Sequence, residues 1–420
     1  MSKKVRVLVV DDSALMRKLI PQMLASDESI EVVGTAMDGT FCLKKIEELK
    51  PNVVTLDLEM PGMNGIDTLK EIMRRQPVPV IVFSSHSIEG ATVTMKALGL
   101  GAFDFVTKPK DASAHMAETA RELIAKVKAA SECKLKPRLL SGKPVAPEKL
   151  PASNASPTKI VAIGVSTGGP QALEYVLTQL PADFPGAITI VQHMPDGFTD
   201  MFARRLDEVC PMRVKEAQSG DLLQAGRVLI CPGSRHMKVK RLPLGDIAVL
   251  SDEPRVNGHR PSADVLLRSV ADEFKANALG VLMTGMGDDG AEGLGAIKKE
   301  GGFTVAQNEE SCVVYGMPKA AIERGYAIRV VGLDIMAATI QAIVGRASDA
   351  GSPTTRSLPR CGRRSSRPRT AVLEAISALT RSESPAPSAR RWSRTTRSAR
   401  PRPSPSSSLA TSSSPTTEAS

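Results

Sequence analysis

The segment at residues 280–290, GVLMTGMGDDG, begins as an apolar run and ends in a glycine-rich turn. Its glycines match G-x-G-x-x-G, a pattern that in nucleotide-binding proteins leads from a strand into a helix. Acidic residues follow about twenty positions later, where dinucleotide-binding proteins carry the acid that binds the ribose. Yet Asp288 and Asp289 lie in the turn that would hold the pyrophosphate, and their charge would repel it. The segment therefore argues against a dinucleotide site and leaves its two carboxylates to be explained.

A candidate nucleophile lies in residues 164–168, GVSTG, which fit the pattern G-x-S-x-G. This pattern presents a serine on a sharp turn between a strand and a helix. Backbone N–H groups and the positive end of the helix dipole would stabilise an oxyanion at such a turn. The pattern alone is not specific, and a serine at its ordinary pKa is a poor nucleophile. Ser166 therefore needs a base nearby.

Three histidines in residues 158–347 are candidate bases: His193, His236 and His259. The first two follow predicted strands, so position alone does not choose between them. A triad also needs a carboxylate that holds the imidazole in one tautomer. The turn with Asp288 and Asp289 follows its own strand and so reaches the same edge of the sheet as the candidate serine. Either aspartate could instead cap the helix that comes next.

Five polar groups in the first 130 residues also follow predicted strands. They are Asp11 and Asp12 after the first strand, Asp57 after the third, Ser84 after the fourth and Lys108 after the fifth. Sites in open α/β sheets form beyond the carboxyl ends of the strands, and three clustered carboxylates favour a hard cation such as Mg²⁺. Asp57 could then attack a phosphoryl group. Lys108 would pair with the phosphoryl oxygens, and Ser84 would hydrogen-bond to them.

The elements that must position these groups alternate between short apolar runs and amphipathic stretches. In residues 1–130 the predicted strands are VRVLVV, EVVGTA, VVTLDL, PVIVFSS and AFDFVTKP. In residues 158–347 they are KIVAIGVS, AITIVQHM, RVLICPG, DIAVLSD, ALGVLMTG and FTVAQ. This alternation predicts two α/β domains, each with a parallel sheet covered by helices on both faces.

Two further segments lack such periodicity. Residues 131–157 are rich in Pro, Lys and Ser and are predicted to be a linker. Residues 348–420 are rich in Arg, Ser and Pro and too poor in large apolar residues to build a core, which predicts a disordered tail. Residues 351–420 hold 13 Arg, no Lys and 3 Glu. A frame-shifted sequence is one explanation for so abrupt a change in basic residue type.

Composition excludes several classes of protein. The net charge of +10 comes from residues 351–420, because the 350 residues before them carry 42 basic and 42 acidic groups. The predicted domains therefore have no basic excess for nucleic acid. Six scattered Cys fit reduced cytoplasmic thiols better than a disulfide framework. No signal peptide and no run of about 18 apolar residues is found. We predict a cytoplasmic protein with no membrane insertion and no nucleic-acid partner.

The first 130 residues resemble a known family. The strand-end polar groups, with DxxMPGMxG and TKP, are similar to the receiver domain of two-component response regulators over residues 4–128, which has a flavodoxin-like (βα)5 fold. The resemblance implies that a histidine kinase phosphorylates Asp57. It also implies Mg²⁺ on the acidic pocket of Asp11, Asp12 and Asp57 and on the backbone carbonyl of Glu59. Receivers are switches, so the second domain is expected to hold the output.

The second domain resembles the catalytic domain of the chemotaxis protein-glutamate methylesterases, the CheB family. The matching motifs, over about residues 158–345, are AIGVSTGGPQAL, QHMPDGFT, CPGSRHM, NGHRPSADVL, LTGMGDDGAEG and AQNEESCVVYGMPKAA. Carried over by motif, Ser166 is the nucleophile, His193 the general base and Asp289 the orienting carboxylate. Many family members have Asn before that aspartate, where this chain has Asp288. Thr167 and Met286 are our candidates for the oxyanion hole. The implied fold is a Rossmann-like parallel sheet.

The resemblance implies a phosphorylation-activated hydrolase of chemotactic adaptation. It would demethylate glutamate methyl esters on the cytoplasmic helices of chemoreceptors, releasing methanol, and deamidate specific receptor glutamines, with no cofactor for the ester chemistry. Three alternatives are a dehydrogenase, a receiver with a DNA-binding output, and a phospho-regulated scaffold with an inactive esterase site. The acidic turn opposes the first. The charge balance and the lack of a helix-turn-helix pattern oppose the second, and the intact Ser, His and Asp set opposes the third.

Overall fold

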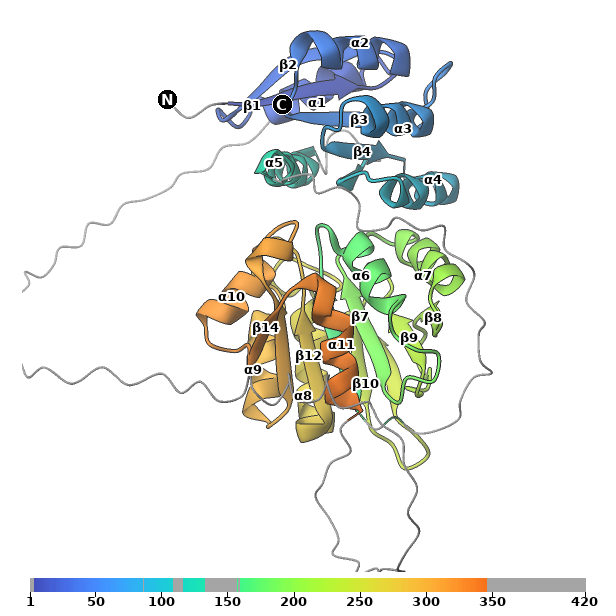
Figure 1. Ribbon diagram of the computed structural model, residues 1–420, viewed down its shortest axis with the longest axis vertical. Coiled ribbons are helices and arrows are strands. Elements are labelled where there is room, and N and C mark those ends of the chain that lie inside the picture. Colours follow the sequence, from blue (N-terminus) through green and yellow to red (C-terminus); the bar gives the residue numbers. More distant parts are fainter. Residues whose placement is uncertain (1–3, 86, 109–115, 133–156, 158, 346–420) are drawn as a thin grey trace, which may run out of the picture. The chain divides into compact units, whose positions relative to one another are not determined.

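A computed structural model of the chain describes residues 4–345 apart from 86, 109–115, 133–156 and 158. The predicted tail lies outside the described residues, and so does the predicted linker except for its ends. The described residues form two α/β arrangements, one on each side of the predicted linker, and each is considered by itself (Figure 1).

The first domain is built on a parallel five-stranded sheet in the order β2-β1-β3-β4-β5. Its strands are β1 (Val5–Val10), β2 (Ile30–Ala36), β3 (Val53–Asp57), β4 (Val80–Ser84) and β5 (Asp104–Thr107). Apolar residues of α1 (Met16–Leu24) and α5 (Met116–Glu132) pack on one face. Those of α2 (Gly39–Leu49), α3 (Gly65–Arg75) and α4 (Ile88–Gly99) pack on the other. Because both faces are covered, the central strands are apolar along most of their length.

The second domain is built on a parallel seven-stranded sheet in the order β14-β13-β12-β6-β7-β9-β8. Its strands are β6 (Ile160–Val165), β7 (Ala187–Gln192), β8 (Arg213–Glu216), β9 (Arg227–Ile230), β12 (Ala278–Leu282), β13 (Phe303–Gln307) and β14 (Arg329–Val331). One face packs on α6 (Gly169–Leu177), α7 (Phe198–Val209) and α11 (Leu333–Val344). The other packs on α8 (Ala263–Phe274), α9 (Ala291–Lys299) and α10 (Met317–Glu323). This agrees with the predicted parallel-sheet fold class.

Some strands of the second domain differ from the prediction. Residues 246–252 form no part of the parallel sheet, because β11 (Ile247–Ser251) pairs with β10 (His236–Lys240) in a separate antiparallel hairpin. The strands β8, β10 and β14 were not predicted. They are short, and charged residues interrupt them, so they lack the apolar run that marks a buried strand. Two turns of 3-10 helix, Lys275–Asn277 and Glu309–Ser311, complete the fold.

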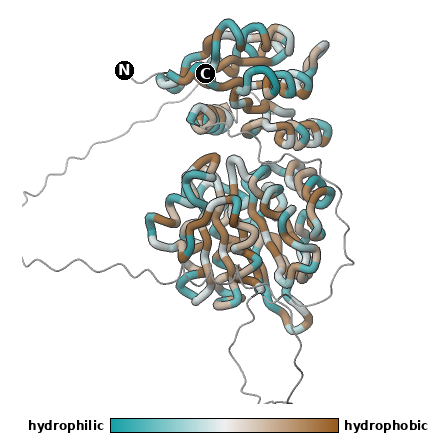
Figure 2. The backbone as a smooth tube through the Cα atoms, in the orientation of Figure 1, coloured by the Kyte–Doolittle hydropathy of each residue, from teal (hydrophilic) through white to brown (hydrophobic). Residues whose placement is uncertain are grey.

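The hydrophobic residues concentrate on the strands in the interior of each domain, and the outward faces of the helices are hydrophilic (Figure 2). In the part of the chain that the structure describes, no helix combines the length and the apolar character needed to cross a membrane.

Candidate active site and phosphoacceptor pocket

The turn between β6 and α6 presents Ser166. Gly168 has φ +77°, a backbone conformation that favours glycine, and a Cβ there would also lie 2.5 Å from Val313. The Ser166 N–H donates to the carbonyl of Thr284 at 3.0 Å, and the Ser166 carbonyl accepts from the N–H of Gly169 at 2.8 Å. The turn is therefore fixed at both sides of the serine, which agrees with the predicted strand-turn-helix unit.

Strand register brings His193 to the same edge of the sheet as the serine. Val165 and Gln192 are partners at the ends of the neighbouring strands β6 and β7, and Ser166 and His193 follow them directly. The His193 N–H donates to the Val165 carbonyl at 3.2 Å. The Gln192 amide Nε2 donates to the Ser166 carbonyl at 3.0 Å. The two segments are thus tied together by hydrogen bonds on each side of the candidate pair.

Asp289 contacts the imidazole of His193. The distance between His193 Nε2 and Asp289 Oδ2 is 2.8 Å, and Asp289 is only 1% exposed. Its oxygens also accept from the Ser262 hydroxyl at 2.7 Å and from the Ala263 N–H at 2.7 Å. Burial alone would raise the pKa of Asp289, but the hydrogen bonds from His193, Ser262 and Ala263 outweigh it and hold the pKa well below its usual range. Asp289 is therefore an ionised acceptor.

This contact fixes the tautomer of His193. An ionised carboxylate only accepts hydrogen bonds, so the proton of neutral His193 lies on Nε2. The other ring nitrogen, Nδ1, is buried and has no hydrogen-bond partner among the described residues. Nδ1 is consequently the atom of His193 that can accept a proton from a nucleophile.

Asp288 contacts a different partner from Asp289. Its carboxylate is exposed and lies 2.6 Å from the Arg324 guanidinium. The N-cap of α9 is Gly290, and the Gly293 N–H in the first turn donates to the side chain of Asp264 at 2.6 Å. The structure therefore brings Asp289 to the imidazole, and neither Asp288 nor Asp289 caps the helix with its side chain.

The other sheet-end candidate, His236, lies away from solvent with both ring nitrogens engaged. It is 0% exposed, its Nε2 lies 3.0 Å from the Pro254 carbonyl, and its Nδ1 accepts from the Ser262 N–H at 3.3 Å. His236 begins β10 instead of ending a strand of the main sheet. Its contacts fit a structural role that fixes the segment carrying Ser262.

The two oxyanion-hole candidates belong to two turns, one after β6 and one after β12. Thr167 follows it on the turn and is buried. Met286 lies in the turn after β12, and Gly285 lets that turn approach closely, because a Cβ on Gly285 would lie 2.8 Å from Ser166 Cβ. The Gly285 carbonyl accepts from the Met317 N–H at 2.9 Å, which holds this turn in place.

Sequence reasoning missed the groups that hold Asp289. Besides Ser262, the amide Nδ2 of Asn257 lies 3.2 Å from Asp289 Oδ1. Both residues belong to the motif NGHRPSADVL. Its Asn-Gly pair is a turn signal that could have indicated a fixed loop, but nothing in the spacing indicated which carboxylate the loop would contact.

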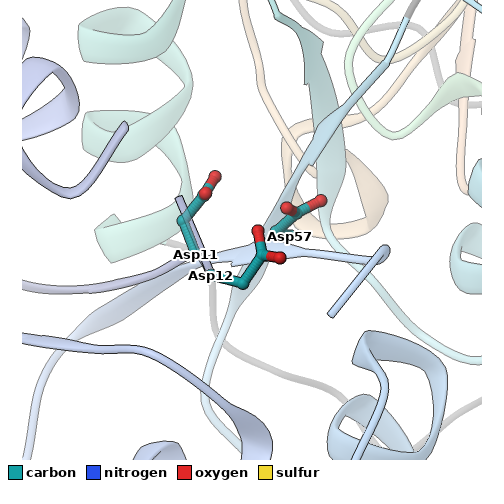
Figure 3. A group of neighbouring side chains, drawn as sticks. All are labelled: Asp11, Asp12 and Asp57. Carbon is teal, nitrogen blue, oxygen red and sulfur yellow. The ribbon is translucent and has the colours of Figure 1, made fainter. Parts of the chain in front are cut away.

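In the first domain, the strand ends bring the predicted pocket together. Figure 3 shows the carboxylates of Asp11, Asp12 and Asp57 gathered at the ends of β1 and β3. One oxygen from each lies within 4.8 Å of the others. Lys108 Nζ is 2.7 Å from Asp57 Oδ2 and 3.1 Å from Asp11 Oδ2. The Glu59 N–H donates to Asp57 Oδ1 at 3.2 Å.

The charges of this pocket fit a hard cation. Burial raises the pKa of Asp11 and of Asp57 above the ordinary value, although Lys108 acts in the opposite direction. One lysine therefore does not fully offset the cost of burying two carboxylates beside a third acidic group. Oxygen ligands of this kind suit Mg²⁺, and receiver domains typically bind it.

The Ser84 hydroxyl is directed toward α4. Its Oγ accepts from the Thr94 hydroxyl at 2.7 Å and lies 3.3 Å from the Gly90 carbonyl. The Ser84 carbonyl accepts from the Lys108 N–H at 2.7 Å. The hydrogen bond between this hydroxyl and a phosphoryl group on Asp57 stays a prediction.

Magnesium is expected to stabilise the first domain of the full chain. A ligand that binds only the folded state at 100 times its Kd adds about 2.7 kcal/mol to the free energy of unfolding. We expect MgCl₂ to raise the Tm of this domain in calorimetry. Asp12→Ala removes an exposed carboxylate of this pocket that has no ion pair with Lys108, and it should abolish the shift. An equal shift in Asp12→Ala would place the ion elsewhere.

Comparisons with known families agree with this two-part arrangement. Residues 7–120 match the model of the response regulator receiver domain, and residues 161–340 match the model of the CheB methylesterase. Each range covers most of one of the two α/β arrangements described above, although α5 and α11 extend past its end. The chain is thus a response regulator whose second domain is an enzyme of the esterase class.

Similar curated proteins cover both domains together. Protein-glutamate methylesterase/protein-glutamine glutaminase 2 of Koribacter versatilis is 61% identical over 344 residues, which cover 79% of this chain and 94% of that protein. The protein-glutamate methylesterase/protein-glutamine glutaminase of Symbiobacterium thermophilum is 46% identical and covers 82% and 98%. That of Halalkalibacterium halodurans is 47% identical and covers 81% and 98%. The chain belongs to the CheB family of receiver-linked protein-glutamate methylesterases/protein-glutamine glutaminases.

Proposed function

We propose that the chain removes methyl groups from glutamate methyl esters of chemoreceptors and deamidates specific receptor glutamines, with Ser166, His193 and Asp289 as its triad. The observation that carries this assignment is the His193 ring. One nitrogen is bound to an ionised, buried Asp289, and the other has no hydrogen-bond partner in the described part of the chain and lies at the sheet edge of Ser166. That arrangement is what a base needs in order to activate a serine.

The reaction then runs in two halves. Ser166 Oγ attacks the side-chain carbonyl carbon while His193 Nδ1 takes its proton. The tetrahedral intermediate collapses, the bond to the methoxy oxygen breaks, and methanol leaves with the proton from His193. Water, deprotonated by the same nitrogen, then attacks the acyl-enzyme. The second tetrahedral intermediate collapses, which restores Ser166 with its proton from His193 and leaves a glutamate carboxylate. From glutamine, the first leaving group is ammonia.

Two features of the site lower the barrier. Asp289 stabilises the imidazolium that forms on His193 and keeps the ring in one orientation. The N–H groups of Thr167 and Met286, on the two turns beside Ser166, are proposed to donate to the oxyanion. A donor of this kind typically contributes about 10²–10³ in rate.

The first domain is proposed to switch this activity. Asp57 is the phosphoacceptor, a chemotaxis histidine kinase the phosphodonor, and Lys108 pairs with the phosphoryl oxygens. The carboxylates of Asp12 and Asp57 and the carbonyl of Glu59 would hold Mg²⁺, which neutralises negative charge in the pocket. The substrates are the cytoplasmic helices of chemoreceptors, which would locate the enzyme in the cytoplasm.

Phosphorylation is expected to depend on the Asp57 carboxylate and on metal. With a small-molecule phosphodonor, the intact chain should gain one phosphoryl group that hydroxylamine removes, detected by mass spectrometry, and EDTA should prevent it. Asp57→Asn should gain none. Glu59→Ala is the matched control, because it keeps the backbone carbonyl and alters only an exposed side chain, and it should be phosphorylated like the parent. Phosphate on Asp57→Asn would move the acceptor elsewhere.

The esterase is tested with chemoreceptor membranes that carry labelled methyl esters. Release of labelled methanol by the intact chain, at a rate proportional to its concentration, supports the proposal. Failure to release methanol under phosphodonor would instead favour the scaffold alternative, which nothing in the names of the curated relatives supports.

A further inference from the structure

His259 belongs to a turn whose role the proposed chemistry leaves open. Its imidazole stacks on that of His193, with 3.9 Å between ring centroids and 8° between ring planes. The short separation and the nearly parallel planes mean that the two rings meet face to face. The ring that is proposed to carry a proton during catalysis therefore has one face covered by a second imidazole.

The backbone holds His259 firmly in this place. Val256 and His259 exchange two hydrogen bonds, at 3.0 and 2.9 Å, across a two-residue turn. The central residues Asn257 and Gly258 have φ +52° and +78°. Two positive φ values are the mark of a type I′ turn, for which Asn-Gly is the favoured pair. The imidazole of His259 is thus held by a well-defined turn.

The same turn reaches the acid of the triad. Asn257 Nδ2 lies 2.8 Å from Asp264 Oδ2 and 3.2 Å from Asp289 Oδ1. Asp264 is itself buried and accepts from the Gly293 N–H at 2.6 Å. One turn therefore contacts both Asp289, through Asn257, and His193, through His259. Because both contacts come from one turn, the turn helps to hold Asp289 and His193 in a fixed relative position.

We propose that His259 is a positioning residue for the general base: its stacked ring fixes the plane of the His193 imidazole and stabilises the imidazolium formed when Ser166 loses its proton. The proposal rests on the proposed triad. A neutral aromatic face attracts a cation placed over it, and the attraction grows when water is excluded. Burial, and then the neighbouring charge of His193, lower the pKa of His259 to about 4, so its ring is neutral near pH 7.

The alternative is that His259 merely fills space beside the triad. The two roles differ in which substitution rescues activity. A packing role needs the volume and shape of imidazole, whereas stacking needs an aromatic face. His259→Phe keeps a flat ring with a negative face but has no ring nitrogen, and His259→Ala removes the face altogether.

The test is methanol release by the full chain with phosphodonor, measured as kcat and KM. We expect His259→Ala to lower kcat about tenfold with little change in KM, and His259→Phe to recover most of that loss. A second readout is the rate at which a fluorophosphonate modifies Ser166, which needs the base but no receptor. This rate of modification should fall by a similar factor in His259→Ala and stay near that of the parent in His259→Phe.

Several outcomes would overturn the proposal. They are an unchanged kcat in His259→Ala, a raised KM with unchanged kcat, or a His259→Phe variant as slow as His259→Ala although its Tm equals that of the parent. Ser166→Ala, assayed beside them, separates the two hypotheses. If it is inactive while His259→Ala is normal, only the role of His259 fails. If it remains active, the proposed triad fails.

Discussion

Replacing Ser166 with alanine is expected to abolish methanol release from methylated chemoreceptor membranes. Removing the nucleophile of a serine triad typically lowers kcat by about 10⁶, which leaves activity below detection in this assay. Fold should be retained, because the hydrogen bonds of this turn to Thr284 and Gly169 use the backbone of Ser166 and not its hydroxyl. The variant should also lose labelling by a fluorophosphonate, with the adduct in the parent mapped to Ser166 by mass spectrometry.

Ser219→Ala is the matched control for this experiment. Ser219 belongs to the same domain, and its hydroxyl accepts from the Leu250 N–H at 2.9 Å in an exposed position. It should release methanol like the parent. An adduct on a serine other than Ser166, or an active Ser166→Ala, contradicts the assignment of the nucleophile.

Asp289→Asn is expected to have the second largest effect, about a 10⁴-fold loss of kcat. Asparagine keeps the shape of the side chain, but its amide can donate to Nε2 of His193. The ring proton would then lie on Nδ1, the nitrogen that must accept the proton of Ser166. Loss of the carboxylate also leaves the imidazolium without its counter-charge. Methanol release measures the effect, and calorimetry checks that the variant is folded.

The neighbouring residue provides the control for charge. Asp288→Asn removes one negative charge at the adjacent position, but that carboxylate is exposed and paired with Arg324. We expect its activity to lie within about twofold of the parent, because an exposed ion pair contributes little. If Asp288→Asn were the slow variant and Asp289→Asn the normal one, the carboxylate that orients His193 would have been misassigned.

Much of the fold could be predicted from residue patterns because parallel sheets leave a strong signal. Strands buried on both faces, such as β6, are continuous apolar runs, and polar residues at their carboxyl ends indicate sites. The predicted resemblance to the receiver and CheB families is confirmed. The strands β8, β10 and β14 were missed because their short, charged segments carry no such pattern, and β11 was predicted as a strand but belongs to a separate hairpin.

The contacts around the triad were harder to predict because they depend on side-chain geometry between distant segments. Sequence reasoning left His193 and His236 open, and also Asp288 and Asp289. The structure distinguishes them by contact: His193 meets Asp289, His236 is enclosed by Pro254 and Ser262, and Asp288 turns to Arg324. No spacing rule relates residues nearly one hundred positions apart to a single hydrogen bond.

The central claim is that one chain joins an aspartate phosphoacceptor to a serine esterase that it controls. The most direct test is methanol release from methylated chemoreceptor membranes by the parent, Ser166→Ala and Asp57→Ala, each with and without a small-molecule phosphodonor. We predict that phosphodonor raises the rate of the parent, that Ser166→Ala stays inactive in both conditions, and that Asp57→Ala keeps a basal rate that phosphodonor does not raise. Equal stimulation of the parent and Asp57→Ala would contradict the claim.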